Sequence, residues 1–276
     1  MIKRRALRLL ATAAISLAGA AAWACSDPPD EPDDPYVVTS VPWTAPEVLS
    51  YVLLNESEDE EVGRGTLSLF EAGGETTLYQ SFSNVEGDAT DESVLVTEAL
   101  LEPLRGSREL IDAESDERRT VDTEYGTLDD GDYGVRIRQE VFDPAEADEA
   151  DSKRCNPLGL PESAYDNDSS LFLWRTLPFE ERLEVQYTAA IPNRRDSRVV
   201  TLLVDEVEEI ETPAGTFDAW HILIIAEGQS HDAWFDVEAP HRMVRYDNDQ
   251  QVFLYEGESD NIIIPSDPPG VSQDCE

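Results

Sequence analysis

Basic residues, histidine and cysteine are scarce in this 276-residue chain. Only 20 Lys and Arg accompany 60 Asp and Glu, so the formal net charge is −40, and the chain has three His and three Cys. So acidic a chain has no basic surface for nonspecific binding to nucleic acid. Hydrophobic residues still make up 40% of the sequence. That share is enough to build a core, so the composition predicts a folded protein despite its charge.

Motifs of the common enzyme classes are also missing. The sequence contains no P-loop, H-E-x-x-H, C-x-x-C or G-x-S-x-G, and Gly63-x-Gly65 lacks the third glycine of a dinucleotide fingerprint. In the hairpin expected below, His221 and His231 lie on opposite faces and cannot share a metal ion. The sequence therefore predicts a protein without catalytic residues, cofactor or metal site.

The N-terminus has the three parts of a signal peptide over residues 1–24: a basic start, an apolar run and small residues before Cys25. The segment Ala22-Trp23-Ala24-Cys25 resembles the lipobox of bacterial lipoproteins, although Ala22 stands where Leu is usual and Trp23 is bulky. We expect acylation of Cys25. The alternative is ordinary signal-peptidase cleavage after Ala24.

From Cys25 onward, the sequence predicts three parts. Residues 25–41 are acidic and rich in proline, a composition that does not pack, and they predict an extended tether to the membrane. Residues 42–257 form the predicted single domain, and residues 258–276 form a C-terminal tail. No stretch after the signal peptide is long and uncharged enough to span a bilayer. We therefore expect an exported protein held at the cell membrane or cell surface by its lipid.

Acylation of Cys25 would leave Cys155 and Cys275 as an even pair of cysteines in an oxidising compartment. We expect them to form a disulfide. The bridge would close a loop of about 120 residues and stabilise the fold by roughly 4–5 kcal/mol in the chain-entropy model. The alternative is two unpaired thiols.

Alternation with a period of two residues dominates from Glu47 to Glu256 and predicts a mainly β fold. One helix is expected at Ser169–Leu177, and the acid-rich stretches Glu86–Glu92, Asp112–Glu117 and Asp143–Asp151 are expected to be loops or insertions. The expected strands are Val48–Leu54, Gly65–Phe70, Thr76–Phe82, Val94–Leu100, Arg119–Tyr125, Tyr133–Phe142, Arg182–Ile191, Val199–Ile210, Phe217–Ala226, His231–Val237, Met243–Tyr246 and Val252–Tyr255.

Turn residues predict how the C-terminal strands pair. Thr212-Pro213-Ala214-Gly215 should fold one strand back on the next, and the two-residue loop Glu227-Gly228 should pair Ile224 with His231. One face of that hairpin then carries Trp220, Ile222, Ile224, His231, Ala233 and Phe235. The other face is also half apolar, so we expect both faces to be covered.

Several of these segments resemble a bacterial envelope family of unknown function whose members carry a T-P-A-G-x-F motif followed by W-F. The matching segments are Thr212–Trp220, Ala233–Val237, Val244–Tyr246, Glu47–Tyr51 and Leu173–Phe179. The resemblance implies a strongly curved antiparallel sheet, or half-barrel meander, with a short helical lid. The implied fold is similar to that of the LolA/LolB-like domains, which hold lipid or acyl chains. The family pattern has no counterpart for the acidic insertions between Glu86 and Asp151.

The leading functional hypothesis is a non-enzymatic, membrane-tethered envelope lipoprotein whose concave face binds a lipid or another small hydrophobic molecule. The expected lining residues are Trp220, Ile222, Ile224, Ala233 and Phe235, with Trp174 and Phe179 from the lid. The alternative is that these residues form the core, and that the protein is a ligand-free structural or protein-interaction module of the cell surface. The sequence leaves the oligomeric state open.

Overall fold

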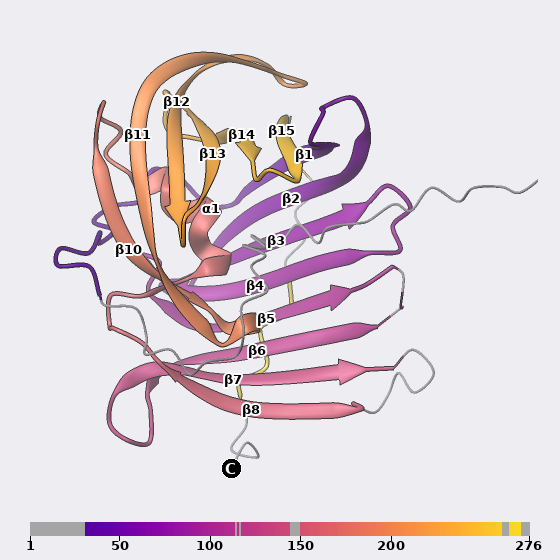
Figure 1. The fold of residues 1–276 in the computed structure, drawn as a ribbon, viewed down its shortest axis with the longest axis vertical. Helices are drawn as coiled ribbons and strands as arrows, with labels where there is room; N and C mark the ends of the chain where they lie inside the picture. Colours follow the sequence, from indigo (N-terminus) through magenta and orange to yellow (C-terminus); the bar gives the residue numbers. More distant parts are fainter. Residues whose placement is uncertain (1–30, 114, 116, 144–149, 261–264, 272–276) are drawn as a thin grey trace, which may run out of the picture.

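A single curved sheet of fifteen strands, which bends round without closing, makes up most of the molecule (Figure 1). The computed structural model describes residues 31–271 except residues 114, 116, 144–149 and 261–264. The expected mainly β class is confirmed. None of the helices in these described ranges is long and apolar enough to cross a membrane.

The strand order follows the chain in two meanders that meet in the middle of the sheet. The first meander runs outward through β1 (Glu47–Asn55), β2 (Glu61–Ala72), β3 (Glu75–Asn84), β4 (Thr90–Glu98), β5 (Pro103–Ile111), β6 (Arg118–Thr127), β7 (Tyr133–Phe142) and β8 (Ser152–Gly159). The second runs inward through β9 (Tyr165–Asp166), β10 (Glu184–Ile191), β11 (Asp196–Thr212), β12 (Gly215–Ala226), β13 (Gln229–Asp236), β14 (Met243–Asp247) and β15 (Gln251–Glu258). The two meanders are joined by antiparallel pairing of β1 with β15.

The predicted C-terminal hairpins are confirmed residue by residue. Thr212 pairs with Gly215 across the first turn, and Ile224 pairs with His231 across the second. The inner face of β12 and β13 is buried, with Ile222 and Phe235 fully enclosed. This result follows from the strict alternation of strand side chains between two faces.

The outer face of the same hairpin differs from expectation. Its side chains are only half-buried, so the expected cover on both faces is wrong. The Trp234 ring instead lies between the His221 ring, at 4.9 Å, and the Arg245 guanidinium, at 5.2 Å. Stacking between neighbouring strands thus shields the apolar surface that a second layer would otherwise cover.

A short helical segment, Asn167–Thr176, fills the concave side of the sheet (Figure 1). It consists of η2 (Asn167–Ser169), α1 (Ser170–Leu173) and η3 (Trp174–Thr176), which confirms the expected helix. All four residues of α1 are buried. The segment therefore completes the main hydrophobic core from inside the curve.

Three strands were missed and the acid-rich stretches were partly misassigned. Strands β5, β8 and the two-residue β9 were not expected, and β4 begins at Thr90, inside a stretch predicted to be a loop. The region between Glu86 and Asp151 therefore consists mainly of regular strands of the first meander, not of insertions. Asp112–Glu117 does connect two strands, as predicted.

Part of the stretch that the composition assigned to a tether packs on the domain. The signal peptide and Cys25 lie outside the described residues, but Pro35 bridges to Gln186 and the Val38 side chain is buried. The Tyr36 hydroxyl donates a hydrogen bond to the Thr176 carbonyl at 2.7 Å. Residues 35–41, which the composition assigned to an extended tether, therefore pack along the domain.

Residues 265–271 of the C-terminal tail lie on the convex side of the first meander. Pro268 and Val271 are buried, and Gly270 lies beside the Glu124 side chain of β6, which points away from the concave side. Cys155 on β8 is disulfide-bonded. Cys25 and Cys275 both lie outside the described residues, so pairing of Cys155 with Cys275 stays a prediction.

Candidate functional site

The seven residues expected to line a ligand site come together in one hydrophobic cluster. The Phe179 ring lies 6.3 Å from Trp220 and 5.9 Å from Phe235, measured between ring centres. Trp174 donates its indole N–H to the Tyr187 hydroxyl at 3.0 Å. The members that are fully or almost fully buried are Trp174, Ile222, Ile224, Ala233 and Phe235. In the structure these side chains pack on one another as a core.

Three cavities in the described structure are lined by other residues. Two small cavities of about 20 Å³ each flank Arg108, next to the start of the helical segment. Each is large enough for about one water molecule. An open groove of about 570 Å³ lies at the other end of that segment, between the start of β1, Pro240 and Arg242.

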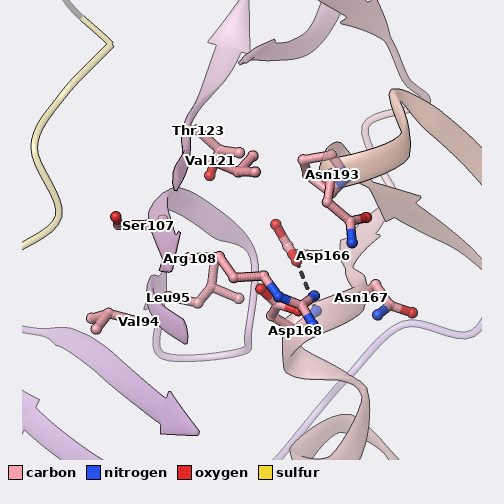
Figure 2. Close-up of a pocket in the computed structure, with 12 residues that line it drawn as sticks. Val94, Leu95, Ser107, Arg108, Val121, Thr123, Asp166, Asn167, Asp168 and Asn193 are labelled. Atoms are coloured by element: carbon pink, nitrogen blue, oxygen red, sulfur yellow. Dashed lines mark hydrogen bonds and ion pairs between the residues drawn. The ribbon is translucent and has the colours of Figure 1, made fainter. Parts of the chain in front are cut away.

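Beside the two small cavities lies a group of polar side chains, which we call the Asp166 cluster: Asp91, Arg108, Tyr125, Asp166 and Asp168. Figure 2 shows Arg108, Asp166 and Asp168 of this cluster. Arg108 donates two hydrogen bonds to the Asp91 carboxylate, at 2.8 and 2.6 Å, and a third to Asp168 at 3.0 Å. The Tyr125 hydroxyl donates to the Asp166 carboxylate. Strands β4, β5 and β6 each contribute one member, and the chain entering η2 contributes two.

Local sequence explains why the two aspartates sit where they do. Asp166 caps the helical segment, because its Oδ1 atom accepts a hydrogen bond from the Asp168 backbone N–H at 2.8 Å. The Gln80 side chain of β3 donates to the Asp168 carbonyl. The helical segment is therefore fixed to the sheet at its first residues by polar contacts.

The Asp166 cluster holds three carboxyl groups against one guanidinium. Burial, followed by the nearby Asp168 carboxylate, raises the pKa of Asp166 to about 7. Burial also raises the pKa of Asp168, although Arg108 opposes this rise and 22% of the Asp168 side chain remains exposed. Asp166 is therefore the member of the cluster that titrates near neutral pH.

A second polar contact fixes the other end of the helical segment. Arg175, which is 1% exposed, donates to both Glu47 carboxylate oxygens, at 2.6 and 3.0 Å. It also donates to the Pro240 carbonyl and lies 5.0 Å from the Trp43 ring. This buried bidentate pair joins η3 to the first strand and to the loop before β14.

The remaining titratable candidates lie apart from one another. The predicted placement of His221 and His231 on opposite faces is confirmed, and His221 lies 2.7 Å from the Asp232 carboxylate. In the described part of the chain, no three His, Cys, Asp or Glu side chains are grouped so as to hold a metal ion. The Asp166 cluster and the Arg175 pair, which the sequence did not single out as functional, are the main buried polar sites.

A family model for proteins of unknown function, DUF3108, matches residues 60–253, from the start of β2 into β15. The chain belongs to the DUF3108 family. The matched range contains the whole helical segment but not Glu47, the ion-pair partner of Arg175. No curated protein matches this DUF3108 chain.

Three solved structures are similar to the DUF3108 chain in fold. A β-barrel-like protein of the unknown-function domain DUF1849 from Brucella abortus is 12% identical, with a TM-score of 0.41 over 78% of this chain and 98% of that one. A Bacteroides fragilis protein with a YmcC-like fold, provisionally described as exported, is 9% identical, with a TM-score of 0.30 over 80% and 98%. A Parabacteroides distasonis protein, provisionally described as a lipoprotein, is 11% identical, with a TM-score of 0.28 over 82% and 100%.

Proposed function

We propose that this DUF3108 chain is a non-enzymatic protein of the bacterial envelope, exported and anchored by a lipid on Cys25, whose β-domain is a ligand-free interaction module. The N-terminal pattern of residues 1–25 supports export and anchoring. The observation that supports the ligand-free role is the packing of the concave side. Ala233 and Phe235 have no exposed surface, and the helical segment occupies the space above them.

A second candidate function is transport or storage of a hydrophobic molecule, as the likeness to LolA/LolB-like domains implies. The observation that favours it is the contrast between the two ends of the helical segment and its middle. Its ends are held by ion pairs, whereas Leu171, Phe172 and Leu173 rest on an apolar surface. If the segment moved away, Ile222, Ile224, Ala233 and Phe235 would line a cavity.

Native mass spectrometry of residues Ser26–Glu276, which lack the signal peptide and Cys25, purified without detergent, separates the two functions. We expect the mass of the bare protein, because the core is filled by its own side chains. A stoichiometric apolar adduct, recovered by lipid extraction, would contradict the ligand-free proposal and favour transport. The search for protein partners would follow only from the first result.

The anchor is tested separately by replacing Cys25 with Ser in the full-length chain. We expect the variant to move from the membrane fraction to the soluble fraction, because one acyl attachment site is lost. Cys275→Ser is the matched control, since it removes a cysteine at the other end of the chain and should leave the protein in the membrane fraction. Unchanged membrane association of Cys25→Ser would contradict lipid anchoring.

A further inference from the structure

The helical segment is attached to the sheet by two different kinds of polar contact. At its C-terminal end Arg175 and Glu47 form a balanced pair, one positive and one negative. At its N-terminal end, the buried carboxyl groups of Asp91 and Asp166 and the partly exposed one of Asp168 lie around a single guanidinium, that of Arg108. The first attachment has equal numbers of acidic and basic groups, whereas the second has more acid than base.

The groups that face Asp166 come from every neighbouring element. Strand β4 contributes Asp91, β5 contributes Arg108, and β6 contributes the Tyr125 hydroxyl, while Asp168 follows in η2. On β10 the partner of Asp166 is the apolar Ala190. In η4 (Pro192–Arg194), Arg194 interacts electrostatically first with Arg198, Glu227 and Asp196 and least with Arg108. If all three carboxyl groups were ionised, the cluster around Arg108 would carry two uncompensated negative charges. Such charges are costly here, because Asp166 is only 3% exposed to solvent.

We propose that the docking of the helical segment is linked to protonation: the Asp166–Asp168 pair takes up one proton when the segment lies on the sheet, and loss of this proton favours release of the segment. The two small cavities beside the pair each have room for about one water molecule that could exchange the proton. The device is a proton-controlled latch at one end of the segment, with the Arg175 pair as the permanent attachment at the other.

The direction of the effect follows from linkage. The pKa of Asp166 is about 7 in the docked state, whereas an aspartate in water has a pKa of about 3.9. Between these values the docked state binds one more proton than the released state. The equilibrium constant for release should therefore rise up to about tenfold per pH unit as the pH rises towards 7. Above that pH both states are ionised and the constant should level off.

Hydrogen–deuterium exchange of the mature chain tests the latch. Protection of the amides of Leu171–Leu173 would be measured from pH 5 to pH 9 and corrected for the intrinsic pH dependence of exchange. Amides of the β1–β15 pair, which lie in the centre of the sheet, report global unfolding. We expect protection of the helical amides to fall as the pH rises and to level off near pH 7, while the reference amides do not follow the same curve.

Three variants sharpen the test. Asp166→Asn keeps an oxygen for the Asp168 amide but cannot ionise, so its helical protection should not change between pH 5 and pH 7. Tyr125→Phe removes a hydrogen bond that favours the ionised Asp166 carboxylate, so the pKa of Asp166 should rise. The pH at which helical protection levels off should therefore be higher in this variant. Asp122→Asn is the control, because this buried carboxyl pairs with Arg138 away from the segment and should leave the curve intact.

Two results would overturn the proposal. One is helical protection in the wild-type chain that does not change with pH. The other is a pH dependence that persists unchanged in Asp166→Asn while that variant remains folded by the reference amides. If Asp166→Asn fails to fold, an unshifted curve for folded Tyr125→Phe would also overturn it. Neither result depends on whether the protein carries a hydrophobic ligand.

Discussion

The segment that contains Arg175 could be recognised from the sequence, but the burial of Arg175 and its pairing with Glu47 could not be predicted. Arg175 lies within Leu173–Phe179, a segment that matches the envelope-family pattern, yet an arginine is almost never expected to be fully buried. Its partner Glu47 is 128 positions away, so no local pattern could pair them. Its neighbours Trp174 and Phe179, which the sequence assigned to the concave face, both pack in the main hydrophobic cluster, with Phe179 partly buried. Burial of aromatic residues needs no knowledge of a partner.

Removal of one partner of the Arg175–Glu47 pair should be costly. Arg175→Met or Glu47→Gln leaves a buried group without its counter-charge, and we expect each to lower the free energy of unfolding by about 3–5 kcal/mol. Urea denaturation of both single variants and of the double variant measures the loss and its coupling. The double variant should lose less than the sum of the two single variants.

Arg64 is the matched control for Arg175. It also forms ion pairs with carboxylates, Glu61 and Glu256, but 57% of its side chain is exposed. Arg64→Met should therefore change stability by less than about 1 kcal/mol. Equal losses for Arg64→Met and Arg175→Met would show that burial of the Arg175 pair does not matter.

At the scale of strands, the sequence predicted the elements whose side chains alternate in polarity and missed those with polar inward or edge positions. The β12–β13 register was predictable because Glu227-Gly228 allows only a tight turn between two apolar strands. Strand β5 escaped because its inward residue Arg108 serves the Asp166 cluster. Strand β8 was not predicted because it lies at an edge of the sheet and carries Lys153, Arg154 and Pro157. Such residues prevent edge-to-edge pairing with other chains, but they interrupt the alternation of polar and apolar residues that predicts a strand.

The pairing of β2 with β3 depends on a close approach at Gly63. A Cβ atom there would lie 2.3 Å from the Ser83 carbonyl oxygen of the neighbouring strand, whereas a Cβ atom on Gly159 in β8 would meet nothing within 4 Å. We expect Gly63→Ala to lower the free energy of unfolding by about 1–3 kcal/mol through local overpacking.

Thermal and urea unfolding of Gly63→Ala and Gly159→Ala checks this expectation. Gly159→Ala should be nearly neutral, because it adds the same methyl group to a strand without crowding it. If the two variants unfold alike, the close approach of β2 and β3 would not be a constraint on this fold.

For the whole molecule, the excess of acid is the dominant property, and composition alone revealed it. A formal charge of −40 on 276 residues repels itself in the compact state. Arg64 pairs with Glu256, and Arg245 pairs with Glu58. These surface pairs offset only a small part of the repulsion, because exposed ion pairs contribute little to stability. What composition could not reveal is that the buried Asp166 cluster is itself richer in acid than in base.

Salt should consequently stabilise the protein. Raising NaCl from about 10 mM to about 500 mM shortens the Debye length from roughly 30 Å to 4–5 Å and screens the repulsion, so we expect the Tm to rise by about 2–8 °C. Differential scanning calorimetry at fixed pH measures this, with KCl at equal ionic strength as the control for specific ion effects. A lower Tm in high salt would mean that surface ion pairs outweigh the repulsion.

The order of the strands has one more consequence, which concerns how the chain could be cut and rejoined. Every pair of neighbouring strands is close in sequence except β1 with β15, where Leu49 lies opposite Glu258. The open edges of the sheet, β8 and β9, are separated by only five residues of chain. A circular permutant that links the ends of β15 and β1 and begins at β9 would join every antiparallel pair of neighbouring strands by a connection that is short in sequence. Its contact order would fall, and it should fold faster than the natural arrangement, in which the central pair must close a loop of about 200 residues.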